Sequence, residues 1–165
     1  MNMQVDSLKK LYMDELRDLV SSESQIIDAM PKMIQSASSK ELKNAFNEHL
    51  DVTKRQLDRL KEIFRNMNES PEGKTCTGME GIIREGQQML SQAADPEVKD
   101  AGLIAAAQRI EHYEIAVYGV VRTYAEILGD EDSRDLLQST LDEEKQTDKK
   151  LTELAVNSIN VEARK

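Results

Sequence analysis

Apolar residues recur along this chain at alternating spacings of three and four, the pattern of helices that bury one face in a bundle. Four such stretches predict four long helices, which span residues 12–37, 42–63, 104–128 and 137–155. Pro31 falls inside the first stretch, but the apolar register continues beyond it. We therefore expect a kink there and not the end of the helix.

The lengths of the connections predict the topology. The first and second helices, and likewise the third and fourth, are joined by almost no spare residues, so each pair should form an antiparallel hairpin. About thirty residues separate the two hairpins and include an amphipathic stretch from about 79 to 93, which predicts a short helix. With flanking extended chain, this segment can cross the length of the bundle. The expected fold is a ferritin-like four-helix bundle with one long crossover.

Local chemistry marks several helix ends. Ser38 with Glu41 three residues later resembles a capping box at the start of the second helix. Residues 95–97, Asp-Pro-Glu, supply an N-cap, a proline at the first helical position and an acid near the positive end of the helix dipole. Gly129 suits a left-handed stop, and Asp130 then suits the N-cap of the fourth helix.

The composition agrees with this all-α prediction. The 165 residues include only 7 Gly and 3 Pro and no Trp, and they suit a single domain over residues 1–165. The 22 basic and 31 acidic residues give a net charge of −9, which argues against nucleic-acid and membrane partners. The start, MNMQVDSLKK, lacks the build of a signal peptide, and the one cysteine, Cys76, is expected to be a loop thiol. We expect a cytoplasmic protein.

Six polar side chains interrupt the apolar stripes near the middle of the helices. They are Glu23, His49, Glu111, Glu114, Glu144 and Asp148. Ionised carboxylates are almost never buried without partners, because desolvation costs several kcal/mol per ion. No Lys or Arg occupies a core position in the four stripes. Another compensating partner is therefore needed.

A metal site is the interpretation that we favour. Five carboxylates and one imidazole suit iron or manganese, with zinc as an alternative, and two divalent ions would bring +4 against a formal −5. Glu111 and Glu114 form a one-turn pair, and Glu144 with Asp148 approximates another. The second helix offers His49, but Val52 stands where a further ligand is expected, so a dinuclear site would lack one ligand.

A metal-free interpretation stays open at this point. The same carboxyl groups would then be protonated, partly exposed, or bonded to one another and to Thr53, Gln56 and Tyr118. The chain would be a structural or interaction module on the same scaffold. His112 lies roughly 100° around the helix from Glu111, which places it on the flank of the site.

Five segments resemble the YciF-type bacterial stress proteins of the ferritin-like superfamily. They are SSESQIIDAMPKM, AFNEHL, KTCTGMEGIIREG, LIAAAQRIEHYEIAVYG and TLDEEKQTDKKLTELA. The resemblance implies a ferritin-like fold, a homodimer and a role in stress responses, and it implies no particular reaction. It also implies that Glu23, His49, Glu111, Glu114 and Glu144 face a metal. Where the family commonly reads HLEET, this chain reads HLDVT, with Val52 in place of Glu.

The sequence therefore predicts a stress-response protein that binds iron or manganese, with redox activity toward peroxide or oxygen if it is an enzyme. No catalytic residue and no small-molecule substrate are indicated. The alternative is a metal-free dimeric module, which the valine at position 52 favours. A DNA-binding mini-ferritin is opposed by the net charge of −9 and the lack of a basic tail.

Overall fold

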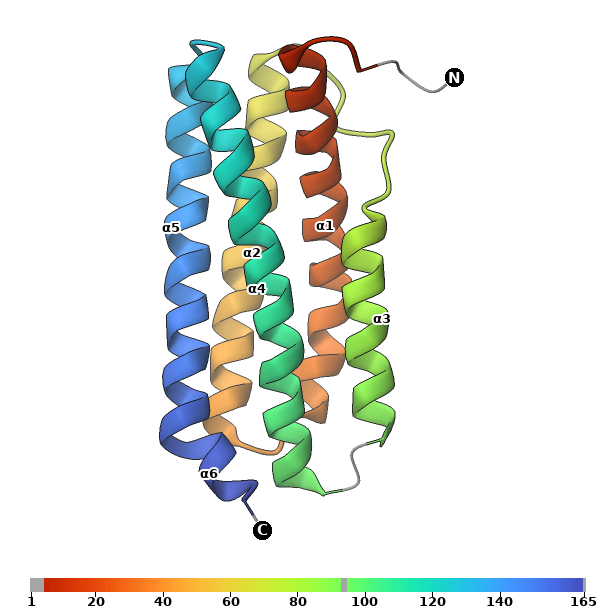
Figure 1. Ribbon diagram of the computed structural model, residues 1–165, viewed down its shortest axis with the longest axis vertical. Coiled ribbons are helices and arrows are strands. Elements are labelled where there is room, and N and C mark those ends of the chain that lie inside the picture. The colour runs from red at the N-terminus through yellow and green to blue at the C-terminus, as the bar shows by residue number, and fades with distance from the viewer. Residues whose placement is uncertain (1–4, 93–94, 165) are drawn as a thin grey trace.

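The computed structural model describes residues 5–92 and 95–164, and these form helices with no strand among them (Figure 1). The elements are α1 (Leu8–Ser36), α2 (Lys40–Asn66), α3 (Thr77–Gln92), α4 (Pro96–Ile127), α5 (Glu131–Leu154), the π-helical turn η1 (Ala155–Ile159) and α6 (Asn160–Glu162). The predicted all-α class is confirmed. None of the described helices combines the length and the apolar character that a membrane span requires.

The long helices form two antiparallel hairpins, α1 with α2 and α4 with α5 (Figure 1). The chain between them crosses the bundle through α3, which packs on the outside against α1 and α4, so that α2 and α4 run in the same direction. This is the predicted ferritin-like topology. α3 begins at Thr77, slightly before the predicted start, and Ala93, its predicted end, lies outside the described residues. α1 continues through Pro31, as expected.

Two of the three predicted helix boundaries are confirmed. The Asp95 carboxylate accepts hydrogen bonds from the backbone N–H groups of Glu97 and Val98, at 3.0 and 3.2 Å. Gly129 adopts the left-handed conformation, with φ of 74°, and Asp130 then caps α5. Both signals lie within a few residues of the chain and need no distant partner.

The predicted capping box at Ser38 is wrong by one residue. Ser39 is the N-cap of α2, and its hydroxyl accepts a hydrogen bond from the backbone N–H of Leu42. The reason lies in α4, where the buried carboxylate of Asp100 accepts the backbone N–H groups of both Ser38 and Ser39, each at 2.7 Å. This distant acceptor holds the turn between α1 and α2 and moves the cap to Ser39.

A polar layer divides the core of the bundle into two apolar clusters. In all four long helices, the layer lies between the residues of one cluster and those of the other. The cluster near the start of α1 includes Tyr12, Leu16, Leu19, Leu60, Ile63, Phe64, Tyr118, Val121, Leu137 and Leu141. The opposite cluster includes Ile26, Met30, Leu42, Phe46, Met79, Leu103, Ile104, Ile110 and Leu151. The layer contains Ser22, Glu23, His49, Thr53, Gln56, Glu111, Glu114 and Glu144, all buried.

The start of α3 docks tightly on α4. A Cβ atom on Gly78 would lie 2.9 Å from Cε2 of Tyr113, so only glycine leaves room for this ring. The ring is held in place because its hydroxyl donates to Asp18 at 2.9 Å and lies 3.0 Å from Sγ of Cys76. Cys76 precedes α3 and is fully buried, and Sγ accepts the backbone N–H of Met79. The expected loop thiol is thus part of the packing of α3.

We predict that Gly78→Ala destabilises the protein by about 1–3 kcal/mol, because the new methyl group overlaps the held ring of Tyr113. Thermal unfolding followed by circular dichroism should show a melting temperature lower by several degrees. Gly81→Ala in the same helix is the matched control. No atom lies within 4 Å of a Cβ at Gly81, so the alanine should keep or raise stability through its helix propensity. Equal melting temperatures for the two variants would contradict this packing argument.

Candidate metal centre

Four helices bring five of the predicted side chains to one level of the bundle. α1 contributes Glu23, α2 contributes His49, α4 contributes Glu111 and Glu114, and α5 contributes Glu144. The four glutamates are 0% exposed and the histidine is 3% exposed. Residues three apart share one face of a helix, which is why both α4 glutamates reach the interior.

Three of these side chains converge closely enough to share one ion. One ligand atom from each of His49, Glu114 and Glu144 lies within 4.8 Å of those of the other two. Ligands held at about 2.1 Å from one metal lie at most about 4.2 Å apart, so a small rotation of the side chains closes the set. Nε2 of His49 also lies 3.3 Å from Oε1 of Glu111, which places that carboxylate beside the triad.

The buried polar atoms of this layer have too few hydrogen-bond partners. The hydroxyl of Tyr118 donates to Oε1 of Glu23, and the side-chain amide of Gln56 donates to Oε1 of Glu144. Among the described residues, the remaining atoms accept or donate no hydrogen bond: Oε2 of Glu23, both oxygens of Glu111 and of Glu114, Oε2 of Glu144 and both ring nitrogens of His49. A buried polar atom without a hydrogen-bond partner lowers the stability of the folded protein. The chain therefore presents a set of free ligand atoms at one point.

Of the partners expected for a metal-free site, two are in place and one is not. Gln56 and Tyr118 each satisfy one carboxylate oxygen. The hydroxyl of Thr53 donates instead to the backbone carbonyl of His49, at 3.0 Å, and does not reach a carboxylate. Two hydrogen bonds do not compensate the burial of four carboxyl groups.

Burial shifts the pKa values of the layer strongly. Burial, reinforced by the neighbouring carboxylates, raises the pKa of Glu23, Glu111 and Glu114 well above the ordinary range. Burial also raises the pKa of Glu144, although the neighbouring carboxyl group of Glu111 and the amide of Gln56 offset part of the effect. Burial lowers the pKa of His49 to about 4. The imidazole is therefore neutral at pH 7, the form that binds a metal.

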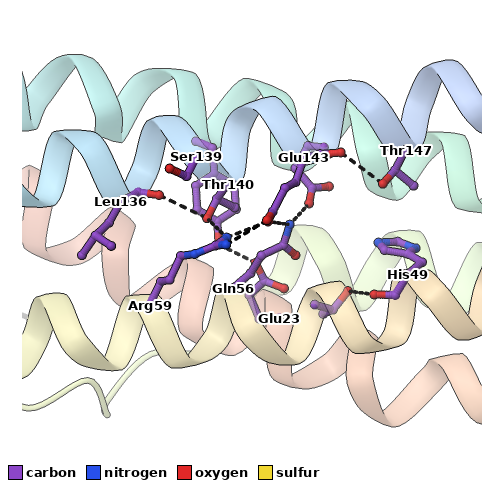
Figure 2. A network of polar contacts seen from close by, with 12 residues as sticks. Glu23, His49, Gln56, Arg59, Leu136, Ser139, Thr140, Glu143 and Thr147 are labelled. Atoms are coloured by element: carbon purple, nitrogen blue, oxygen red, sulfur yellow. Dashed lines mark hydrogen bonds and ion pairs between the residues drawn. The ribbon is translucent and has the colours of Figure 1, made fainter.

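An ion pair at the edge of the layer was not foreseen from the sequence. Figure 2 shows Arg59 of α2 reaching Glu143 of α5, with nitrogen–oxygen distances of 2.6 and 2.8 Å. The amide of Gln56 also donates to Glu143, at 3.2 Å, and so bridges Glu143 and Glu144. Burial acts to raise the pKa of Glu143, but the bonds and charge of Arg59 outweigh it and lower the value. Glu143 is thus ionised, and it helps to orient Gln56.

The sequence pattern around Arg59 and Glu143 indicates their ion pair only weakly. In the run from Asp142 to Lys145, only Glu144 is buried. Arg59 follows Gln56 by one turn and borders the apolar stripe without being part of it. Its contact with Glu143 depends on how closely α2 and α5 pack.

Asp148 is the predicted ligand that the structure does not bring into the layer. Its side chain is 30% exposed, and Oδ1 lies 3.0 Å from Nε2 of His112. Asp148 lies four residues beyond Glu144, which rotates it by about 40° around α5 toward the surface. There the exposed His112, placed on the flank as expected, is its partner.

Val52 lies beside the layer and not within it. It is half-buried and lines a groove between α2 and α5 together with His49 and Glu143. The predicted vacant ligand position is therefore next to His49, at the wall of this groove.

Comparisons with known proteins extend over nearly the whole chain. A family model described as "Domain of unknown function (DUF892)" matches residues 7–164. Protein YciF from Escherichia coli strain K12 is 40% identical over 162 residues, which are 98% of this chain and 98% of that protein.

Solved structures show the same arrangement. The E. coli stress protein YciF matches with a TM-score of 0.90 and 39% identity, over 94% of this chain and 99% of that one. YcfI from Rhodopseudomonas palustris, for which a structural role has been suggested, matches with a TM-score of 0.89 and 36% identity, over 92% and 97% of the two chains. A protein from Xanthomonas campestris pv. campestris matches with a TM-score of 0.73 over 96% of this chain and 99% of that one. Because the two sequences are only 18% identical, this match supports a shared fold and nothing further.

We predict that the metal-free protein loses stability as the pH rises from about 6.5 to 8. The four buried carboxyl groups have raised pKa values, so the folded state binds more protons than the unfolded state, and the free energy of unfolding falls with pH. His49 acts in the opposite direction, but only between its lowered pKa of about 4 and its ordinary value near 6.5. Urea unfolding at several pH values with a chelator present measures the slope.

The variant Glu111→Gln with Glu144→Gln should flatten this slope, because two of the four raised carboxyl groups are gone. The control is Glu85→Gln with Glu153→Gln, which makes the same charge change at exposed positions. The other charged groups that act on these carboxyl groups, Arg59, Glu143 and Asp148, are unchanged in both variants. Parallel slopes in the two variants would show that the buried carboxyl groups are not the source of the pH dependence.

Proposed function

Because the chain belongs to the DUF892 family and is 40% identical to protein YciF, which is described as a stress protein, we propose that it is a stress-response protein that binds iron or manganese in its polar layer. The observation that supports the proposal is the set of converging, buried carboxylate and imidazole atoms without hydrogen-bond partners among the described residues. A divalent cation satisfies these atoms and neutralises their charge at the same time.

The donor set fits such an ion. His49, Glu114 and Glu144 would hold the first metal, and Glu23 and Glu111 border it. One nitrogen and several carboxylate oxygens suit iron or manganese better than a soft, thiolate-seeking metal. A second metal would have Glu23 and Glu111 available but lacks the ligand that Val52 replaces.

When bound, iron or manganese would supply redox chemistry toward oxygen or peroxide. The chain itself holds the ligands in place for it. Tyr118 orients Glu23 through its hydroxyl, and Gln56, steadied by Glu143, orients Glu144. Partners of this kind fix the direction of ligand side chains and tune their basicity. The two apolar clusters on either side of the layer keep bulk water away from it.

A metal-free structural or interaction module is the second candidate. The valine at position 52 and the structural role suggested for YcfI of Rhodopseudomonas palustris favour it. In that case the carboxyl groups would be protonated, as their raised pKa values allow. The homodimer expected from the family resemblance belongs to both proposals.

We predict that the purified protein, stripped with a chelator and reconstituted anaerobically with Fe(II) or Mn(II), retains about one ion per chain. Elemental analysis after desalting measures the ratio. At a metal concentration of about a hundred times Kd, binding should add about 2.7 kcal/mol to the free energy of unfolding. The variant Glu114→Gln with Glu144→Gln should lose both effects, and the exposed control Glu85→Gln with Glu153→Gln should keep them. Wild-type protein that retains neither metal would leave the metal-free module as the function.

We further predict that Val52→Glu strengthens a second site, because it places a carboxylate one turn from His49 on the same side of α2. Isothermal titration with Mn(II) should show the stoichiometry rising toward two ions per chain, or a tighter second binding step. Val52→Gln is the control, since it has the same size and no charge. If both variants bind like the wild type, position 52 is not a vacant ligand position.

A further inference from the structure

A groove between α2 and α5 leads from the surface to His49. Its volume is about 260 Å³, and its inner walls include Val52, Glu143 and Thr147. The exposed side chains of Glu48, Arg55 and Lys150 line its outer part. Six water molecules occupy about 180 Å³ in the liquid, so the groove has room for a hydrated divalent ion.

His49 connects this groove to the polar layer. The four glutamates of the layer are 0% exposed, whereas His49 both lines the groove and contributes a ligand atom to the converging triad. His49 is only 3% exposed, and neither ring nitrogen has a hydrogen-bond partner among the described residues. An ion that enters the groove therefore meets an available imidazole before it meets the buried carboxylates.

An ion pair between α2 and α5 lies at the outer part of the groove. The ammonium group of Lys150 contacts the carboxylate of Glu48, and their side chains are 51% and 66% exposed. Exposed ion pairs contribute little to stability, so this one opens readily. Opening moves a positive charge away from the path and frees the Glu48 carboxylate for an arriving cation. Arg55, the other cation here, lies near the negative charge of Glu143.

We propose that this groove is the route by which a divalent cation reaches the buried cluster, and that the Lys150–Glu48 pair closes it. The inference rests on the proposed metal-binding function and adds the path to it. A residue on the path changes the rates of uptake and release by the same factor and leaves Kd unchanged, whereas a ligand changes Kd. This difference separates the path from the site itself.

The test uses Co(II) alone with chelator-stripped, full-length protein. Stopped-flow absorption measures uptake, transfer to excess EDTA measures release, and equilibrium titration measures Kd. Val52→Phe fills the groove and should slow uptake and release severalfold by equal factors. Val120→Phe, at an exposed position on α4, is its matched control and should behave like the wild type.

Lys150→Met removes the ammonium group and therefore the ion pair, keeps a long flexible side chain, and should speed uptake by about two- to fivefold. Lys149→Met makes the same charge change on the same helix, at a side chain that pairs with Glu153 outside the groove, and should leave the rate unchanged. Circular dichroism confirms that each variant is folded. Lys150→Met tests the route even if Val52→Phe does not fold.

The outcomes separate this proposal from the one on which it rests. Wild-type protein that binds no Co(II) would overturn both. Binding with the same rates in Val52→Phe and Val120→Phe, or in Lys150→Met and Lys149→Met, would overturn the route and leave the metal site in place. A changed Kd in Val52→Phe with an unchanged uptake rate would likewise overturn it, because Val52 would then act on the site and not on the path.

Discussion

The energetic cost of burying four carboxyl groups at one level is the constraint around which this bundle is organised. Each ionised carboxylate costs several kcal/mol when it leaves water, and a domain of this size has a net stability of only about 5–15 kcal/mol. The chain supplies two direct hydrogen bonds to these groups, from Tyr118 and Gln56. The groups must therefore take up protons or bind a cation. The raised pKa values favour the uptake of protons, and the convergence of ligand atoms around His49 suits the binding of a cation.

The rest of the fold keeps this layer in position. Apolar clusters on both sides exclude water from it, and each long helix contributes to both clusters. At the edge, the ion pair of Arg59 with Glu143 steadies Gln56, which reaches the inner carboxylate of Glu144. Across the bundle, α3 covers the seam of α1 and α4, and Gly78 allows its close approach to Tyr113. Two segments of the family resemblance, KTCTGMEGIIREG and LIAAAQRIEHYEIAVYG, thus contact each other.

The relation to YciF concerns the whole scaffold, since the similarity extends from one end of the described bundle to the other. Within this scaffold, Val52 departs from the HLEET pattern that the family resemblance implies. It lies at the wall of the groove beside His49. If the layer binds metal as proposed, a valine there removes a ligand and also shapes the path to the site. Under that proposal, position 52 affects both the number of ions bound and the route by which an ion reaches the site.

The sequence by itself determined the helices, their topology and most of the candidate site. Periodicity and connection lengths are local properties, as are the caps at Asp95 and Asp130, and all of these were predicted correctly. The polar layer was also predictable, because Glu23, Glu111, Glu114 and Glu144 interrupt otherwise apolar stripes at mid-height.

Tertiary structure alone decided the contacts between side chains on different helices. Asp100 of α4 binds the turn before α2 and moves its cap to Ser39, and Arg59 finds Glu143 across the gap to α5. Asp148 pairs with His112 at the surface and leaves the layer. Helical periodicity specifies the direction of a side chain around the helix only to within about 100°, the angle between consecutive residues. Whether a residue at the edge of that face points inward or outward depends on the distance and rotation of the adjacent helix, which only the packed bundle determines.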